Sequence, residues 1–168
     1  EFSSKNTFSF NVNKNLKFDN FKVQSSVDLK QLIVSKKKFR LKSYFPNSIG
    51  DVKLEKHKII INYNKNKIDI NGNGNILLNN KPDKLSYQII KDNSNLAFIS
   101  KINLKNNLLL IDFLNYEKKE GLSSFISIKG NYNKNEQLRF DLINFKEKKN
   151  EISISGLELN KDFKIINI

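Results

Sequence analysis

The stretch "NKIDINGNGNILLNN", residues 66–80, could be either a phosphate-binding loop or a β-strand. A dinucleotide-binding loop needs a third glycine and then a helix, whereas Gly74 is followed by "NILLNN" and soon by Pro82. Every second residue is apolar or glycine, namely Ile68, Ile70, Gly72, Gly74, Ile76 and Leu78. The residues between them are mostly Asp and Asn, with Leu77 as the exception. Because side chains of a strand alternate between its faces, we predict a strand with one apolar and one amide-rich face.

The same alternation recurs along most of the chain, for example over Phe8–Val12, Leu85–Ile89 and Leu138–Leu142. Clusters rich in Asn, Asp, Gly and Lys separate these runs, as in Asn64-Lys65-Asn66. This pattern is typical of antiparallel β structure. Only residues 30–45 are ambiguous, since "RLKSYFP" could hold one helical turn ended by Pro46. We therefore predict an all-β chain of roughly ten strands.

Two short patterns repeat. Ile-x-Ile-x-Gly occurs at 68–72, 126–130 and 152–156, and "NYNKN" occurs at 62–66 and 131–135, each time at an expected hairpin turn. The offsets differ, so no regular solenoid is predicted, and the biased composition also accounts for such repeats. If the hairpins share a design, each glycine leaves a gap in the apolar face and lets the sheet bend toward that face.

Length and composition fit a single domain over residues 1–168. The chain has no methionine, and we expect it to be a segment of a longer protein. Its longest apolar run, Leu108 to Ile111, is too short to span a bilayer, so any membrane anchor is expected outside this segment. The absence of cysteine excludes disulfides, thiolate catalysis and cysteine-based metal sites.

The net charge of +13 comes almost entirely from lysine, since the only arginines are Arg40 and Arg139. Arginine makes the forked contacts to phosphate and guanine, so its scarcity disfavours nucleic-acid recognition. The 28 lysines are nearly matched by 27 asparagines, and both residues have AT-rich codons. Apart from the run Lys36-Lys37-Lys38 the lysines are scattered, and we interpret them as a solvated basic face. A second interpretation is that the lysines bind an anionic lipid surface, and binding of nucleic acid is the third.

No arrangement of residues marks a catalytic or metal site. His57 is the only histidine; it lies between two lysines, and we expect it to be exposed on a strand or turn. A triad or a histidine-based metal site needs more than this. Nothing marks a pair of carboxylates for glycoside hydrolysis, and Ser123-Ser124 lack the frame of a nucleophile elbow. We predict a non-enzyme with no catalytic residue, cofactor or metal.

Two arrangements would bury the apolar parity: a closed β-sandwich, or an elongated antiparallel sheet curled into a U-shaped groove. The hydrophobic fraction of 38% is low for a filled sandwich core and favours the groove. Such a groove would accept lipid acyl chains, whose burial contributes about 0.8 kcal/mol per methylene. Parity alone selects the lipid-facing candidates, which are Ile68, Ile70, Ile76, Leu78, Phe98, Ile102, Ile126, Ile128, Ile152 and Ile154.

The chain resembles the AsmA-like family of bacterial proteins, the group that contains YhdP and TamB, and in particular its AT-rich alphaproteobacterial forms. The resemblance is carried by residues 15–34 ("NLKFDNFKVQSSVDLKQLIV"), 44–80 and 108–168. Its elements are a basic strand pair, a Phe-Pro break and then hairpins with Ile-x-Ile-x-Gly. These are patterns of strand and turn, and the family offers no invariant ligand residues to transfer to this sequence.

The resemblance implies a periplasmic β-groove, anchored in the inner membrane through a helix outside this chain. It further implies transport of phospholipid toward the outer membrane and support of that membrane's integrity. Its partners would be phospholipid acyl chains and, through parts of the protein not present here, the two membranes. Two other hypotheses remain: a structural or adhesin-like β-sandwich module, and a nucleic-acid binder whose affinity falls steeply with salt.

Overall fold

The computed structural model describes residues 1–34, 41–133 and 137–168, and almost all of its regular structure is strand. The elements in chain order are β1 (Phe2–Val12), β2 (Phe18–Val34), α1 (Leu41–Tyr44), β3 (Val52–Asn64), β4 (Lys67–Leu77), β5 (Pro82–Asp92), β6 (Asn95–Leu104), β7 (Leu109–Ile111), the 3₁₀ turn η1 (Asp112–Leu114), β8 (Tyr116–Lys118), β9 (Ser124–Tyr132), β10 (Leu138–Glu147), β11 (Asn150–Ile154), β12 (Leu157–Leu159) and β13 (Ile165–Asn167). The stretch 66–80 therefore contains a strand, as predicted. The basic run Lys36-Lys37-Lys38 lies outside the described residues.

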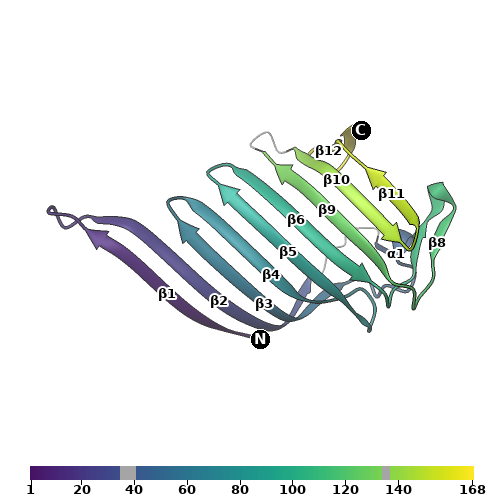
Figure 1. Ribbon diagram of the computed structural model, residues 1–168, viewed down its shortest axis with the longest axis horizontal. Coiled ribbons are helices and arrows are strands. Elements are labelled where there is room, and N and C mark those ends of the chain that lie inside the picture. The colour runs from purple at the N-terminus through teal and green to yellow at the C-terminus, as the bar shows by residue number, and fades with distance from the viewer. Residues whose placement is uncertain (35–40, 134–136) are drawn as a thin grey trace.

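Eleven strands form one antiparallel sheet, in which most neighbours in sequence are also neighbours in space (Figure 1). The order is β1-β2-β3-β4-β5-β6-β9-β10-β12-β13, and β11 also pairs with β10. The excursion between β6 and β9 forms the small β7–β8 sheet. The predicted all-β groove fold, an elongated antiparallel sheet, is confirmed, and the sheet does not close into a barrel. The alternative of a closed sandwich is wrong for the described residues, because the only second sheet there has two strands.

The strand register places the alternating apolar residues of successive strands on the same face of the sheet. One row of cross-strand partners runs Ile61, Ile70, Ile89, Phe98, Gly130 and Phe140. The next row runs Ile59, Gly72, Tyr87, Ser100, Ile128, Ile143 and Ile154. Directly paired residues project from the same side of a sheet. We call this side the apolar face and the opposite side, which carries Asp69, Asn71 and Asn73, the wet face.

The turns follow local sequence signals. In the first "NYNKN" segment Lys65 and Asn66 both have positive φ (46° and 68°), as a two-residue hairpin turn requires. The second copy falls partly outside the described residues. The helical turn expected before Pro46 is present as α1.

Neighbouring rings fill the glycine positions of the apolar face. A Cβ added at Gly72 would lie 2.2 Å from the ring of Tyr87, and one added at Gly130 would lie 2.7 Å from the ring of Phe98. The expectation of a gap at these glycines is therefore wrong: the missing side chain makes room for an aromatic side chain of the adjacent strand. The third Ile-x-Ile-x-Gly differs, because Gly156 has φ +76° and lies between β11 and β12.

His57 is buried, with 1% of its surface exposed, so the expectation of an exposed histidine is wrong. Lys56 adopts a φ of 52° within a bulge, where two residues of β3 oppose the single Gly74 of β4. The bulge places the imidazole against Gly74, where an added Cβ would lie 2.4 Å from Cδ2. The ring Nε2 donates a hydrogen bond to the carbonyl oxygen of Asn75 at 2.9 Å.

The buried core lies at one end of the apolar face. It consists of Ile76, Leu78, Leu104, Leu109 and Phe145, and the partly buried residues packed against it include Phe45, Ile111 and Tyr116. Leu109, Ile111 and Tyr116 belong to the β7–β8 sheet, which with α1 and η1 we call the cap. The cap covers the sheet at this end only, where α1 and β8 lie near each other (Figure 1).

Replacing Gly130 with alanine is expected to lower the free energy of unfolding by about 1–3 kcal/mol. The new Cβ would lie 2.4 Å from the carbonyl oxygen of Arg139, which belongs to the backbone and cannot easily move away. Urea unfolding followed by circular dichroism measures the change. Ser86→Ala, at an exposed position of β5, is the control and should shift stability by less than about 0.5 kcal/mol. Equal stability of the two variants would show that the fit at Gly130 is not tight.

Candidate functional site

The candidate site is the part of the apolar face that the cap leaves uncovered. Its side chains, including Ile61, Ile70, Ile89, Phe98 and Ile128, are each only half-buried. In the described residues no second sheet covers them. They pack sideways against one another, as in the edge-to-face contact between Phe98 and Phe140 with ring centroids 6.0 Å apart. The result is a continuous apolar surface, which in soluble proteins is typical of a site that binds a partner or ligand.

The predicted lining residues fall into three groups along the apolar face. Half-buried positions outside the core cluster are held by Ile68, Ile70, Phe98, Ile128 and Ile154. Ile102, Ile126 and Ile152 pack against the edge of the buried core. Ile76 and Leu78 are buried, with 8% and 5% exposed, so the prediction that they face a ligand is wrong for this structure. Both residues lie on the predicted side of the sheet, but the cap covers them.

Sequence reasoning missed several members of this surface. Ile61, Ile89, Phe140 and Ile143 share its cross-strand rows, and Tyr87 reaches into it across Gly72. Each showed the right alternation in sequence. What was missing was the register, which decides the residues opposite Ile70 or Ile128 and cannot be read from one strand alone.

The apolar face continues onto the first two strands as a cluster of aromatic side chains. Phe8, Phe10, Phe18, Phe21 and Val23 line a shallow hollow there. The rings of Phe10 and Phe18 meet edge to face with their centroids 4.9 Å apart. The ring centroids of Phe21 and of Tyr63 in β3 are 6.1 Å apart. The apolar surface therefore extends from β10 to the free edge at β1.

Buried polar groups hold the cap on the sheet. Asp83, at the start of β5, accepts hydrogen bonds from the backbone N–H groups of Lys105 and Asn106, both at 2.8 Å, and from the side chain of Asn107 at 2.6 Å. Lys118 is fully buried and donates to the carbonyl oxygens of Lys105 and Asn107 at 3.0 and 2.7 Å. Burial lowers the pKa of Lys118, and the charges of Asp83, Glu147 and Glu120 oppose that shift. The cap is thus fixed by specific bonds, and we read this cluster as structural.

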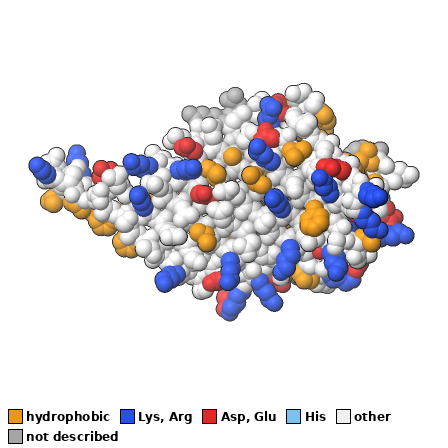
Figure 2. Space-filling view, in the orientation of Figure 1, with side chains coloured by type: hydrophobic (Ala, Val, Ile, Leu, Met, Phe, Trp, Pro, Cys, Tyr) orange, Lys and Arg blue, Asp and Glu red, His pale blue; other side chains and the backbone are white. Residues whose placement is uncertain are grey.

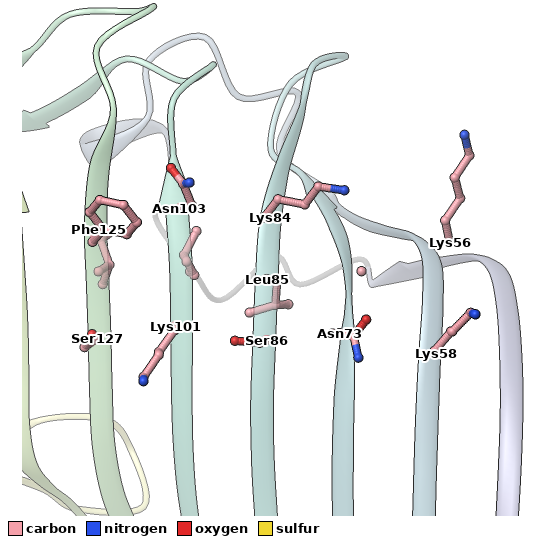
Figure 3. Close-up of a pocket in the computed structure, with 13 residues that line it drawn as sticks. Lys56, Lys58, Asn73, Lys84, Leu85, Ser86, Lys101, Asn103, Phe125 and Ser127 are labelled. Carbon is pink, nitrogen blue, oxygen red and sulfur yellow. The ribbon is translucent and has the colours of Figure 1, made fainter.

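The wet face carries a shallow basic depression of about 460 Å³ (Figure 3). Its lysines, Lys56, Lys58, Lys84 and Lys101, come from β3, β5 and β6, with polar side chains such as Ser86 between them. Lys84 donates to the side-chain oxygen of Asn75 at 2.8 Å. In Figure 3 the labelled lysines, two of them on β3 and one each on β5 and β6, extend in different directions. This arrangement fits a solvated basic face and does not converge on one ligand atom.

The described residues contain neither a group of three His, Asp or Glu side chains that could hold a metal ion nor a helix long and apolar enough to cross a membrane. The chain matches no protein-family model, no curated protein and no solved structure. The open apolar face is therefore the feature of the described residues that points most directly to a function.

A hydrogen bond between the cap and the sheet leads us to expect that the free energy of unfolding falls at alkaline pH. Tyr116 donates a hydrogen bond to the Glu147 carboxylate, and burial, this bond and the carboxylate charge together raise the pKa of Tyr116 above its usual range. Above about pH 10 the unfolded tyrosine loses its proton while the folded one keeps it, so the free energy of unfolding falls as pH rises. Tyr116→Phe should be less stable at pH 7 by about 1–2 kcal/mol and lose less stability between pH 10 and 12. Denaturant unfolding across this pH range measures both effects, and an unchanged alkaline profile would contradict the prediction.

Proposed function

We propose that this chain is a non-enzymatic lipid-handling segment whose open apolar face holds phospholipid acyl chains. The observation that carries the proposal is the uncovered row Ile61, Ile70, Ile89 and Phe98, which continues to Phe140. An open apolar surface of this kind suits a flexible hydrocarbon, which needs no hydrogen-bond partner. The lysines and asparagines of the wet face keep the opposite side in water.

The dimensions of the face match an acyl chain. The six strands from β3 to β10 in sheet order, spaced by about 4.8 Å, make the uncovered surface about 24 Å wide. One leaflet of a bilayer has a hydrocarbon depth of about 15 Å, half of the full core. An acyl chain can therefore lie across the strands with all its methylenes on the protein, each contributing at most about 0.8 kcal/mol, the value for full burial.

In this proposal the chain is one segment of a longer AsmA-like protein. That protein would be anchored to the inner membrane and cross the periplasm, and its groove would carry phospholipid toward the outer membrane and so support that membrane's integrity. The open sheet with one apolar and one wet face supports this assignment, as does the sequence resemblance.

The first test is native mass spectrometry of the chain purified from a bacterial host, followed by lipid extraction. The unaltered chain is expected to carry phospholipid. Ile70→Asp and Ile128→Asp should each lower the bound lipid at least fivefold, because a carboxylate on the apolar face costs several kcal/mol to cover with hydrocarbon. Ile99→Asp is the matched control: Ile99 lies on the wet face of β6, is 41% exposed, and should leave the lipid load unchanged.

Circular dichroism of the same variants separates an open groove from a sealed core. Folded variants that have lost lipid support the groove. A lipid-free parent chain, or unchanged lipid in both variants, would overturn the proposal. Unfolding of both variants would show that this face is a closed core and would favour a structural β module.

A further inference from the structure

The β1–β2 hairpin extends beyond the neighbouring strands as a separate projection (Figure 1). Every residue of β1 is exposed along its length. The turn is nevertheless well built: the side-chain oxygen of Asn13 accepts hydrogen bonds from the N–H groups of Asn15 and Lys17, at 2.9 and 3.0 Å. The backbone N–H of Asn13 also donates to the carbonyl oxygen of Lys17 at 3.0 Å. The projection is therefore a defined structural element.

Several large apolar side chains of this projection are exposed to water, which is energetically unfavourable. Leu16, Phe18 and Phe8 are 82%, 72% and 65% exposed. Leu16 also has a φ of 58°, a left-handed conformation that a bulky residue rarely adopts. Neither burial nor turn geometry accounts for a leucine at this position, and such strain is more common where a residue serves a function.

Basic side chains surround the apolar ones. Residues 5–24 contain Lys5, Lys14, Lys17 and Lys22, against the single carboxylate of Asp19. Lys14 and Lys17 flank Leu16 in the turn, and Lys22 pairs with Ser9 across the hairpin. Figure 2 shows the resulting division of the projection, with hydrophobic side chains along one side and basic side chains at its end and along the other side.

We propose that the β1–β2 hairpin docks onto an anionic phospholipid bilayer. Phe8, Leu16 and Phe18 enter the boundary between headgroups and acyl chains, and the flanking lysines contact the headgroup phosphates. Each lysine near such a surface adds about 1 kcal/mol, and burial of each large apolar side chain adds about 1.5–3 kcal/mol. Charge distinguishes the bilayer from a second copy of the chain. Two hairpins of the same positive sign, on chains of net charge +13, repel each other.

The docking residues lie on β1, β2 and their turn, at the edge of the apolar face and beyond the strands β3 to β10 that are proposed to hold lipid. Docking does not require those strands to carry lipid. Together the two would let the chain sit at a membrane surface while its groove remains open. The hairpin lies at one end of the sheet and the cap at the other (Figure 1), so the bound membrane would not meet the covered end.

Vesicle binding tests the inference directly. The chain contains no tryptophan, so Phe18→Trp introduces a single indole at the hairpin. Its emission is expected to shift to the blue with vesicles of phosphatidylcholine and phosphatidylglycerol at 7:3, and to stay unchanged with phosphatidylcholine alone. Phe125→Trp is the control: Phe125 is 56% exposed on the wet face of β9, and its emission should not shift.

Cosedimentation with the same vesicles measures affinity. The double variant Phe8→Ser with Phe18→Ser, and the single variant Leu16→Ser, should bind at least tenfold more weakly, whereas Phe125→Ser should bind like the parent chain. Binding that is lost in high salt and equal in all variants would reduce the contact to charge alone and overturn the inference. A parent chain that is dimeric by light scattering, with monomeric hairpin variants, would assign the surface to a second copy and also overturn it.

Membrane docking by the hairpin and lipid binding by the apolar face can be tested separately. Leu16→Ser, at a turn residue outside the apolar hollow, should keep the phospholipid that co-purifies with the apolar face, and Ile70→Asp should keep the affinity for vesicles. Loss of one property without the other identifies which of the two sites has failed.

Discussion

Strand register is the constraint on which the rest of this structure depends. Side chains alternate between faces with a period of two, so a shift of one residue would move the apolar side chains of a whole strand into water. The register observed here places Ile61, Ile70, Ile89 and Phe98 in one row. It also places Gly72 opposite Tyr87 and Gly130 opposite Phe98. The rings fit only because those glycines lack a Cβ, which penalises any other pairing of the same strands.

The unequal covering of the apolar face follows from the excursion between β6 and β9. That segment brings its own apolar residues to the sheet, among them Leu109 and Tyr116, and it is fixed by the buried Asp83 and Lys118. A buried lysine costs free energy, and here its donors reach two backbone carbonyl oxygens near the carboxylate of Asp83. The covered end therefore supplies the rigid core, while the remaining face keeps its side chains accessible and can serve as a binding surface.

An open apolar face is an aggregation hazard, and the charge of the chain offsets it. The free edge at β1 is long and unpaired in the described residues, the kind of edge that recruits other strands. Lysines such as Lys5 and Lys22 on the hairpin, and Lys58 and Lys101 on the wet face, give every copy the same sign of charge. The same charge would attract an anionic surface, which is the basis of the proposed docking of the hairpin on a bilayer.

The sequence alone determined the features that depend on neighbours along the chain. Alternation predicted the all-β class and the side of each strand on which Ile70 or Ile128 lies, and Lys65-Asn66 predicted its hairpin turn. Burial was decided only in the tertiary structure, because it depends on segments far apart in sequence. The cap covered Ile76 and Leu78, and a bulge at Lys56 turned His57 inward against Gly74. Local periodicity fixes the direction of a side chain, and only the packed sheet fixes what that side chain meets.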